Sequence, residues 1–226
     1  MKRIVYLMCA AALCLQSCTF IKVRDGETVK PSGNVITVES EIDDFTAVSI
    51  ANSLDVNYVL TDGAPYIRIN GSSNLVERVE YSVTDRVLNI SFKGGVRIIG
   101  NWNLDVTVAS HKLNGVYLSG SGSFEASKIE TEHFDVSLVG SGEVEVDGLS
   151  ANDVSVNVAG SGDAELSGLD CKVLNASVLG SGDIDVKGYA AVATLAVSGS
   201  GSIEASGLRY DDVYKEITGS GEIEVR

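Results

Sequence analysis

Carboxylates recur at a fixed position through the second half of the chain. The third residue after each Gly-Ser-Gly tripeptide is acidic in every case, and the six residues are Glu125, Glu145, Glu165, Asp185, Glu204 and Glu224. Aligned carboxylates can bind a cation such as Ca²⁺ through their oxygen atoms. They can also serve only to keep a protein soluble and to oppose association between sheet edges. We favour the second role, and the strip predicts no more than weak calcium binding.

The residues that polysaccharide enzymes need do not occur in a matching pattern. A hydrolase uses a pair of carboxylates, but the acidic pairs Asp43–Asp44 and Asp211–Asp212 have no histidine or repeat-aligned basic residue beside them. A lyase of the β-helix type needs a strong base, and no arginine lies between Arg97 and Arg209. Gly-Ser-Gly also differs from Gly-x-Ser-x-Gly, the turn that exposes a serine nucleophile. The sequence therefore predicts no catalytic residues.

Histidine and cysteine do not form a metal-binding pattern. His111 and His133 are the two histidines, and neither has a metal-ligating residue at a recognised spacing. His133 takes an outward position before Phe134, where we expect it to be solvated. We therefore expect no cofactor.

The elements that position the carboxylates are set by an internal repeat. Gly-Ser-Gly begins at six glycines with spacings of 19 or 20 residues: Gly120, Gly140, Gly160, Gly180, Gly199 and Gly219. A constant period of this size indicates one structural unit stacked on copies of itself.

Apolar residues alternate on both sides of each tripeptide. Val144 and Val146 follow one tripeptide, and Val154, Val156 and Val158 precede the next. A period of two predicts strands with one buried face, so each unit holds two short strands. Glycine permits the tight corner between them, and a second turn carries an inward leucine. Stacked units then form an all-β, single-stranded parallel β-helix, right-handed by the rule for parallel connections. Tandem hairpins, as in a propeller, would need a unit of about 40 residues.

The region over 34–110 lacks the tripeptide but keeps the alternation. Val48 and Ile50 alternate with polar residues, as do Leu54, Val56 and Tyr58. We expect less regular coils of the same solenoid here, followed by regular coils over 111–226.

One outward surface of the predicted coils is almost uncharged. Small or apolar residues fill the rows before the tripeptides, and the candidate contact residues are Val139, Asn157, Ala159, Asn175, Ser177 and Leu179. In a chain with a net charge of −14, such a face suits contact with a flat partner. The same rows would also be consistent with ordinary exposed β surface.

The N-terminal residues predict export. Lys2 and Arg3 precede a mostly apolar run over 4–15, which is too short to span a bilayer and is typical of a signal peptide. The run ends in Leu-Gln-Ser-Cys, which resembles the lipobox of bacterial lipoproteins, where the cysteine is acylated. We predict a signal peptide over 1–17, lipidation of Cys18, a tether over 18–33 and a β-helix domain over 34–226. The alternative is an ordinary signal peptide with an incidental cysteine.

Removal of residues 1–17 would leave 31 acidic and 17 − 2 = 15 basic residues, a net charge of −16. Nucleic-acid binding depends on Lys and Arg that neutralise phosphates, so this charge argues against it. Cys171 would be the one cysteine besides Cys18, so we expect no internal disulfide.

These features together resemble a known family. The segment Phe-Thr-Ala-Val-Ser-Ile over 45–50, followed by the array of Gly-Ser-Gly with alternating acidic and apolar residues, resembles the auto-transporter adhesin, head GIN domain family. That family is common in exported lipoproteins of the Bacteroidetes. The resemblance covers about residues 34–226 and implies a right-handed β-helix of the pectate-lyase-like class. It implies no catalytic or binding residues.

We therefore expect a non-enzymatic lipoprotein scaffold that acts in binding or adhesion at the cell envelope. The alternatives are a polysaccharide-degrading β-helix enzyme and a structural module that assembles end to end. Expected partners are the membrane, through the N-terminal lipid, and a glycan, a protein or a second copy of the chain. Bacteroidetes lipoproteins that are exported to the cell surface resemble one another in having acidic residues just after the lipidated cysteine. Thr-Phe-Ile-Lys follows Cys18 instead, so we expect an outer-membrane anchor that faces the periplasm.

Overall fold

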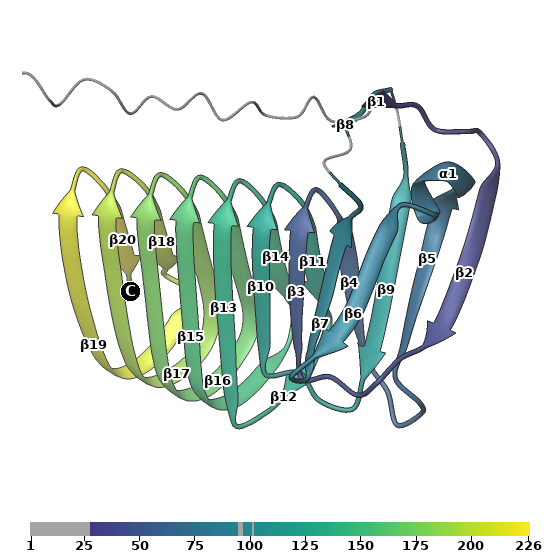
Figure 1. Ribbon diagram of the computed structural model, residues 1–226. Coiled ribbons are helices and arrows are strands. Elements are labelled where there is room, and N and C mark those ends of the chain that lie inside the picture. The colour runs from purple at the N-terminus through teal and green to yellow at the C-terminus, as the bar shows by residue number, and fades with distance from the viewer. Residues whose placement is uncertain (1–27, 95–96, 101) are drawn as a thin grey trace, which may run out of the picture.

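Parallel strands stacked in coils make up most of the molecule. The computed structural model describes residues 28–94, 97–100 and 102–226 (Figure 1). Strands one repeat apart pair in parallel, and each residue lies beside its equivalent in the next coil. The predicted parallel β-solenoid, with about 20 residues per coil, is confirmed.

Two long ladders run along the solenoid. The acidic ladder follows the corners and contains β11 (Ser123–Ala126), β14 (Glu143–Val146), the first part of β16 (Asp163–Gly180), the first part of β17 (Asp183–Gly199), β18 (Ser202–Ala205) and β20 (Glu222–Val225). The neutral ladder precedes the corners and contains β10 (Gly115–Gly120), β13 (His133–Gly140), β15 (Leu149–Gly160), the last parts of β16 and β17, and β19 (Leu208–Gly219). The two ladders form two sides of each coil.

A third, short ladder adds to the two strands per coil that the sequence predicted. β12 (Ile129–Glu130) pairs with the start of β15, and Leu149 pairs in turn with Leu169. Both leucines are buried, as expected for inward residues at the second turn. The backbone at this turn is extended and paired as well, so each regular coil has three strand segments.

One continuous apolar core fills the coils. Val154, Val156 and Val158 are at most 1% exposed, and their equivalents from β10 to β17 are buried in the same way. Burial of such side chains is the main stabilising contribution, at about 25 cal/mol per Å² of apolar surface.

The Gly-Ser-Gly corners stack directly on one another. Gly160 has a φ of 127°, a conformation that residues with side chains rarely adopt. A Cβ atom at Gly160 or Gly162 would overlap the carbonyl oxygen of the equivalent glycine in the preceding coil. Between them, the Ser161 N–H donates to the carbonyl oxygen of Gly140 at 2.8 Å. Glycine therefore recurs because the backbones of adjacent corners are too close for a side chain.

The N-terminal region differs from the expected run of coils. β3 (Ala47–Asn52) and β4 (Asp55–Leu60) pair in parallel with β10 and β11 on one side. On the other side they pair in parallel with β7 (Val87–Phe92) and β9 (Leu104–Ser110). The chain thus leaves its first coil, builds the end of the solenoid, and returns past that coil to β10.

Three other strands of this region pair in antiparallel, so the expectation of coils throughout 34–110 was wrong for them. β5 (Tyr66–Ser72) pairs with both β2 (Val35–Glu41) and β9, and β6 (Val79–Thr84) pairs with β7. The one helix of the described chain, α1 (Ser73–Val76), lies at the same end (Figure 1). It buries Leu75 and Val76. These elements form a cap, because the end of a solenoid otherwise exposes its core and its strand edges.

The folded domain begins before residue 34, so the predicted boundary between an 18–33 tether and the domain was wrong. β1 (Thr28–Val29) pairs with β8 (Arg97–Ile98), and Val29 is only 6% exposed. The Ser32 N–H donates to Asn74 Oδ1 at 2.9 Å. Residues 28–33 therefore pack on the cap, whereas the predicted signal peptide and Cys18 lie outside the described residues. Within the described ranges, no helix has the length and apolar character needed to cross a bilayer.

Candidate functional site

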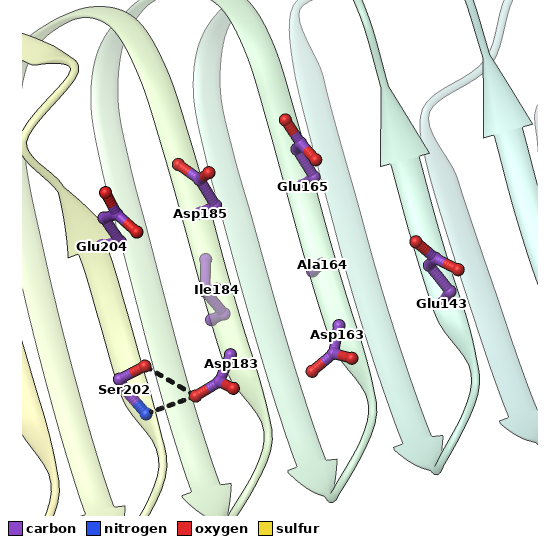
Figure 2. Close-up of a pocket in the computed structure, with 9 residues that line it drawn as sticks. All are labelled: Glu143, Asp163, Ala164, Glu165, Asp183, Ile184, Asp185, Ser202 and Glu204. Atoms are coloured by element: carbon purple, nitrogen blue, oxygen red, sulfur yellow. Dashed lines mark hydrogen bonds between the residues drawn. The ribbon is translucent and has the colours of Figure 1, made fainter.

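The predicted acidic residues form one straight column on the acidic ladder. Glu125, Glu145, Glu165, Asp185, Glu204 and Glu224 pair in register from β11 to β20. A second column, nearer the corners, contains Glu143, Asp163, Asp183 and Glu222. Figure 2 shows acidic side chains of both columns around a shallow hollow on β14 to β18. The alternation of the strands therefore gathers negative charge on this side of the solenoid.

Lys187 lies beside the acidic column and pairs with two of its carboxylates. Its Nζ lies 3.1 Å from Glu165 Oε1 and 2.7 Å from Asp185 Oδ2. The hydrogen bond and charge of Lys187 lower the pKa of Glu165. Burial, followed by repulsion from Asp147 and other carboxylates, raises the pKa of Glu145. The column is therefore not a uniform array of repelling charges, because one lysine pairs with two of its members.

Serine relieves the second column in two places. Ser202 donates to Asp183 Oδ1 from its backbone N–H at 2.9 Å and from Oγ at 2.6 Å (Figure 2). The column continues beyond Glu143 through Ser123 to Asp55, and Ser123 makes the same two bonds to Asp55 Oδ1, at 3.2 Å and 3.0 Å. A serine beside a carboxylate thus replaces a repulsive neighbour with hydrogen-bond donors.

The acidic side has no arrangement typical of a metal site. Among the residues that the structure describes, no group of three or more His, Cys, Asp or Glu side chains is placed to hold one ion. Asp185 leaves Oδ1 without a protein partner, but its side chain is 30% exposed. Carboxylates in a straight column do not surround a cation as the ligands of a calcium site do.

Another side of the coil carries the neutral face, which we define as the three outward rows of the neutral ladder, from β13 to β17, that contain Asn175, Ser177 and Leu179. All six predicted contact residues lie on it: Val139, Asn157, Ala159, Asn175, Ser177 and Leu179. Val139 and Leu179 are 51% and 62% exposed, and they flank Ala159 in one row. The predicted residues are thus brought together on three adjacent strands.

Polar side chains on the neutral face bond to one another. Ser177 Oγ donates to Asn157 Oδ1 at 2.8 Å, across adjacent coils. Asn157 Nδ2 donates to Ser155 Oγ at 3.1 Å along its own strand. These bonds hold the Asn157 amide in one orientation, so the face presents fixed polar groups beside exposed apolar ones.

One aromatic residue at the edge of this face was not among the predicted contact residues. Tyr117 on β10 is in register with Ser137 and is 41% exposed. A Cβ atom at Gly115 would lie 3.2 Å from the Tyr117 hydroxyl, so the missing side chain makes room for the ring. Tyr117 stands before Gly120 at the same spacing as Ser137 before Gly140. Counting the repeat back by one coil would therefore have predicted Tyr117 on this face.

The two histidines lie apart at the surface, each beside an aspartate. His133 Nδ1 is 2.9 Å from Asp153 Oδ2, and His111 Nδ1 is 3.3 Å from Asp44 Oδ1. Both histidine side chains are at least half exposed. His133 and Asp153 lie on the neighbouring strands β13 and β15, and His133 is exposed as expected. His111 reaches Asp44 in the segment between β2 and β3, so the expectation that the Asp43–Asp44 pair has no histidine beside it was wrong.

A family model described as "putative auto-transporter adhesin, head GIN domain" matches residues 44–169 and 147–226. This chain belongs to that family. The head GIN domain assignment confirms the resemblance that the tripeptide array indicated, and it associates the chain with adhesin-like proteins of the cell envelope or exterior.

Solved structures of Bacteroidetes proteins have the same fold as this head GIN domain chain. A protein from Parabacteroides distasonis, described as a putative lipid binding protein, is 24% identical with a TM-score of 0.76. A putative adhesin from Bacteroides fragilis is 21% identical with a TM-score of 0.72. Each alignment covers 88% of this chain and 100% of the other. A comparison with curated proteins found no match.

Proposed function

We propose that this chain is a non-enzymatic binding scaffold of the cell envelope that contacts its partner through the neutral face. The observation that carries the proposal is the neutral face itself, where Val139 and Leu179 are exposed beside an ordered Asn157 amide. Interface centres are depleted in charge and combine apolar surface with oriented hydrogen-bonding groups. Membership of an adhesin-head family supports a role in contact.

The acidic side supports the same role in a different way. A net charge of −14 keeps the solenoid soluble and repels other acidic surfaces. Contact is therefore favoured where charge is lowest, on the rows that contain Ala159 and Ser177. A neutral glycan or an uncharged protein surface fits this face better than a polyanion does.

We also propose that the scaffold is held to the outer membrane, facing the periplasm, by a lipid on Cys18. The apolar run before Cys18 supports this placement. β1 packs at the capped end of the solenoid (Figure 1), so an anchor that precedes it would hold the protein by its cap. The neutral face runs along the coils beyond that cap and would remain accessible.

The test compares two charge-adding variants on a panel of neutral and acidic glycans. Leu179→Lys places a charge in the neutral face, and Glu125→Lys makes an exposed change on the acidic ladder. Because Leu179 is 62% exposed, its substitution should lower the free energy of unfolding by less than about 0.5 kcal/mol. We expect glycans that bind the wild-type protein to bind the Glu125→Lys variant as well. The same glycans should show no binding to the Leu179→Lys variant.

Two results would contradict the proposal. Loss of binding in Glu125→Lys with retention in Leu179→Lys would place the contact on the acidic ladder instead. Release of reducing ends or unsaturated sugars from a polysaccharide by the wild-type protein would identify an enzyme.

A further inference from the structure

The two ends of the solenoid are built differently. At the N-terminal end, β2, β5 and β6 and the helix α1 cover the core, and Leu75 is fully buried there. At the other end, within the described chain, β19 pairs only with β17 and β20 pairs only with β18 (Figure 1). The outer edges of β19 and β20 therefore present unpaired backbone N–H and C=O groups, which can template the addition of another strand.

The open end also presents apolar side chains of core type. Val213, Lys215 and Ile217 on β19 are in register with the buried residues Ala193, Leu195 and Val197. Ile217 is 47% exposed, and among the described residues no strand pairs with the outer edge of β19. An extended segment added to this edge would bury Val213 and Ile217 and would satisfy the backbone groups of β19. Strand addition to a sheet edge derives affinity from backbone hydrogen bonds and specificity from alternate side chains.

Lys215 places a positive charge in the middle of this apolar row. It takes the row position that earlier coils fill with Val136, Val156, Ala176 and Leu195. Among the described residues, no carboxylate lies within ion-pair distance of its Nζ, and its side chain is exposed. A segment that continued the apolar row would bury this ammonium without a partner, which is costly. A carboxylate at the equivalent position would pair with it.

We propose that the C-terminal coil binds an extended segment of a partner protein by strand addition, and that Lys215 selects a segment with a carboxylate inside its apolar row. A second copy of the chain is a poor occupant, because its regular coils offer Val, Ala or Leu at this position. The repulsion between two chains of charge −14 acts in the same direction. This site does not depend on the neutral face, which lies on a different surface.

The test uses peptides that copy one of the chain's own strands. The probe has the sequence of residues 149–160, in which Val156 is equivalent to Lys215 in the stack. It is labelled with fluorescein and made as Val156→Glu and Val156→Lys forms. We expect the wild-type protein to bind the Glu peptide at least about tenfold more tightly than the Lys peptide, because like charges at a desolvated contact are disfavoured. The variant Lys215→Glu should reverse this preference.

Matched variants separate this site from the rest of the surface. Lys172→Glu makes the same charge change at an exposed position on β16 and should leave the preference as in wild type. Leu179→Lys, on the neutral face, should also leave it unchanged. Equal binding of the two peptides, no measurable binding of either, or a preference that survives Lys215→Glu would overturn the proposal. Loss of peptide binding in Leu179→Lys would overturn it as well, since the peptide would then lie on the neutral face.

Discussion

Asn52 lies in the same ladder position as Gly120 and has a left-handed backbone like the glycine, with φ of 75° against 134°. The Ser121 N–H donates to the carbonyl oxygen of Asn52 at 2.9 Å, so the corner stack of the regular coils begins on this residue. Asparagine adopts positive φ more readily than most residues with side chains. A Cβ atom at Gly120 would overlap the Asn52 carbonyl, so each later coil requires glycine at this position.

Gly160→Ala should therefore be strongly destabilising. Alanine would have to adopt the φ of 127° that Gly160 has. Its Cβ atom would also overlap the Gly140 carbonyl oxygen. Backbone strain at such a position costs about 1–3 kcal/mol, and the overlap adds to it, so we expect a loss of about 3 kcal/mol or more in the free energy of unfolding. Denaturant unfolding followed by circular dichroism measures the change.

Ser161→Ala is the matched control within the same corner. Ser161 is exposed and bonds through its backbone N–H, which alanine keeps. Its effect should be within about 0.5 kcal/mol. If the two variants unfolded at the same denaturant concentration, close corner stacking would not be what the tripeptide provides.

The regular coils could be predicted from the sequence because their pattern is local and repeated. The alternation of Val154, Val156 and Val158 decides which side of a strand is buried, and the tripeptide decides which residues share a column. The neutral face follows from the same two facts. Because each strand pairs with its equivalent one repeat away, the pairing partners can be identified from the repeat alone.

The cap could not be predicted in the same way. β6 and β7 are joined by a two-residue turn in which Asp85 and Arg86 both have positive φ, at 52° and 62°. Such hairpin turns are recognised by glycine or asparagine, and Asp-Arg lacks that signal. The return of the chain past β3 and β4 also depends on pairing between distant segments, which no local pattern reveals.

The position of Lys187 was missed because one coil is a residue shorter than the others. Leu166 pairs with Val186 at a separation of 20, whereas Leu169 pairs with Gly188 at a separation of 19. The register shift falls at the corner that carries Lys187. Its side chain lies against Glu165 and Asp185, and a count of fixed repeats does not show this contact.

Lys187→Ala should make stability more sensitive to pH. In wild type, Lys187 lowers the folded-state pKa of Glu165, so Glu165 contributes stability above its unfolded pKa and loses it as pH falls through the folded value. Without Lys187, Glu165 would resemble Glu145, whose pKa is raised in the folded state. A raised carboxyl pKa means that the folded state binds more protons, so stability falls as pH rises.

Thermal unfolding at about pH 7 and about pH 4 should separate these cases, because most carboxylates titrate near the lower value. The loss in Tm caused by Lys187→Ala should be larger at pH 7 and should shrink at pH 4. Lys172→Ala removes an exposed lysine on β16, away from the column, and should show no such dependence. An equal loss at both pH values would mean that the column does not act as a coupled set of charges.

Cys18→Ala should release the protein from the membrane or block its processing. The prediction rests on the cysteine at the end of the apolar run. A single acyl chain binds membranes only marginally, so stable anchoring requires the several chains of a mature lipoprotein. Membrane fractionation and intact mass would measure the change. Retention of Cys18→Ala in the membrane fraction at an unchanged mass would refute lipidation at this residue.

Lys215→Val should promote association between copies of the chain. The substitution completes an apolar row with Val213 and Ile217 on the free edge of β19, where a charge now opposes the addition of another strand. Sedimentation over a range of protein concentrations should show a monomeric wild type and a concentration-dependent dimer or larger species for the variant. Lys215→Arg keeps the charge and should sediment like wild type. A monomeric Lys215→Val at the highest concentration would show that the lysine does not protect this edge, and that repulsion between the acidic columns suffices.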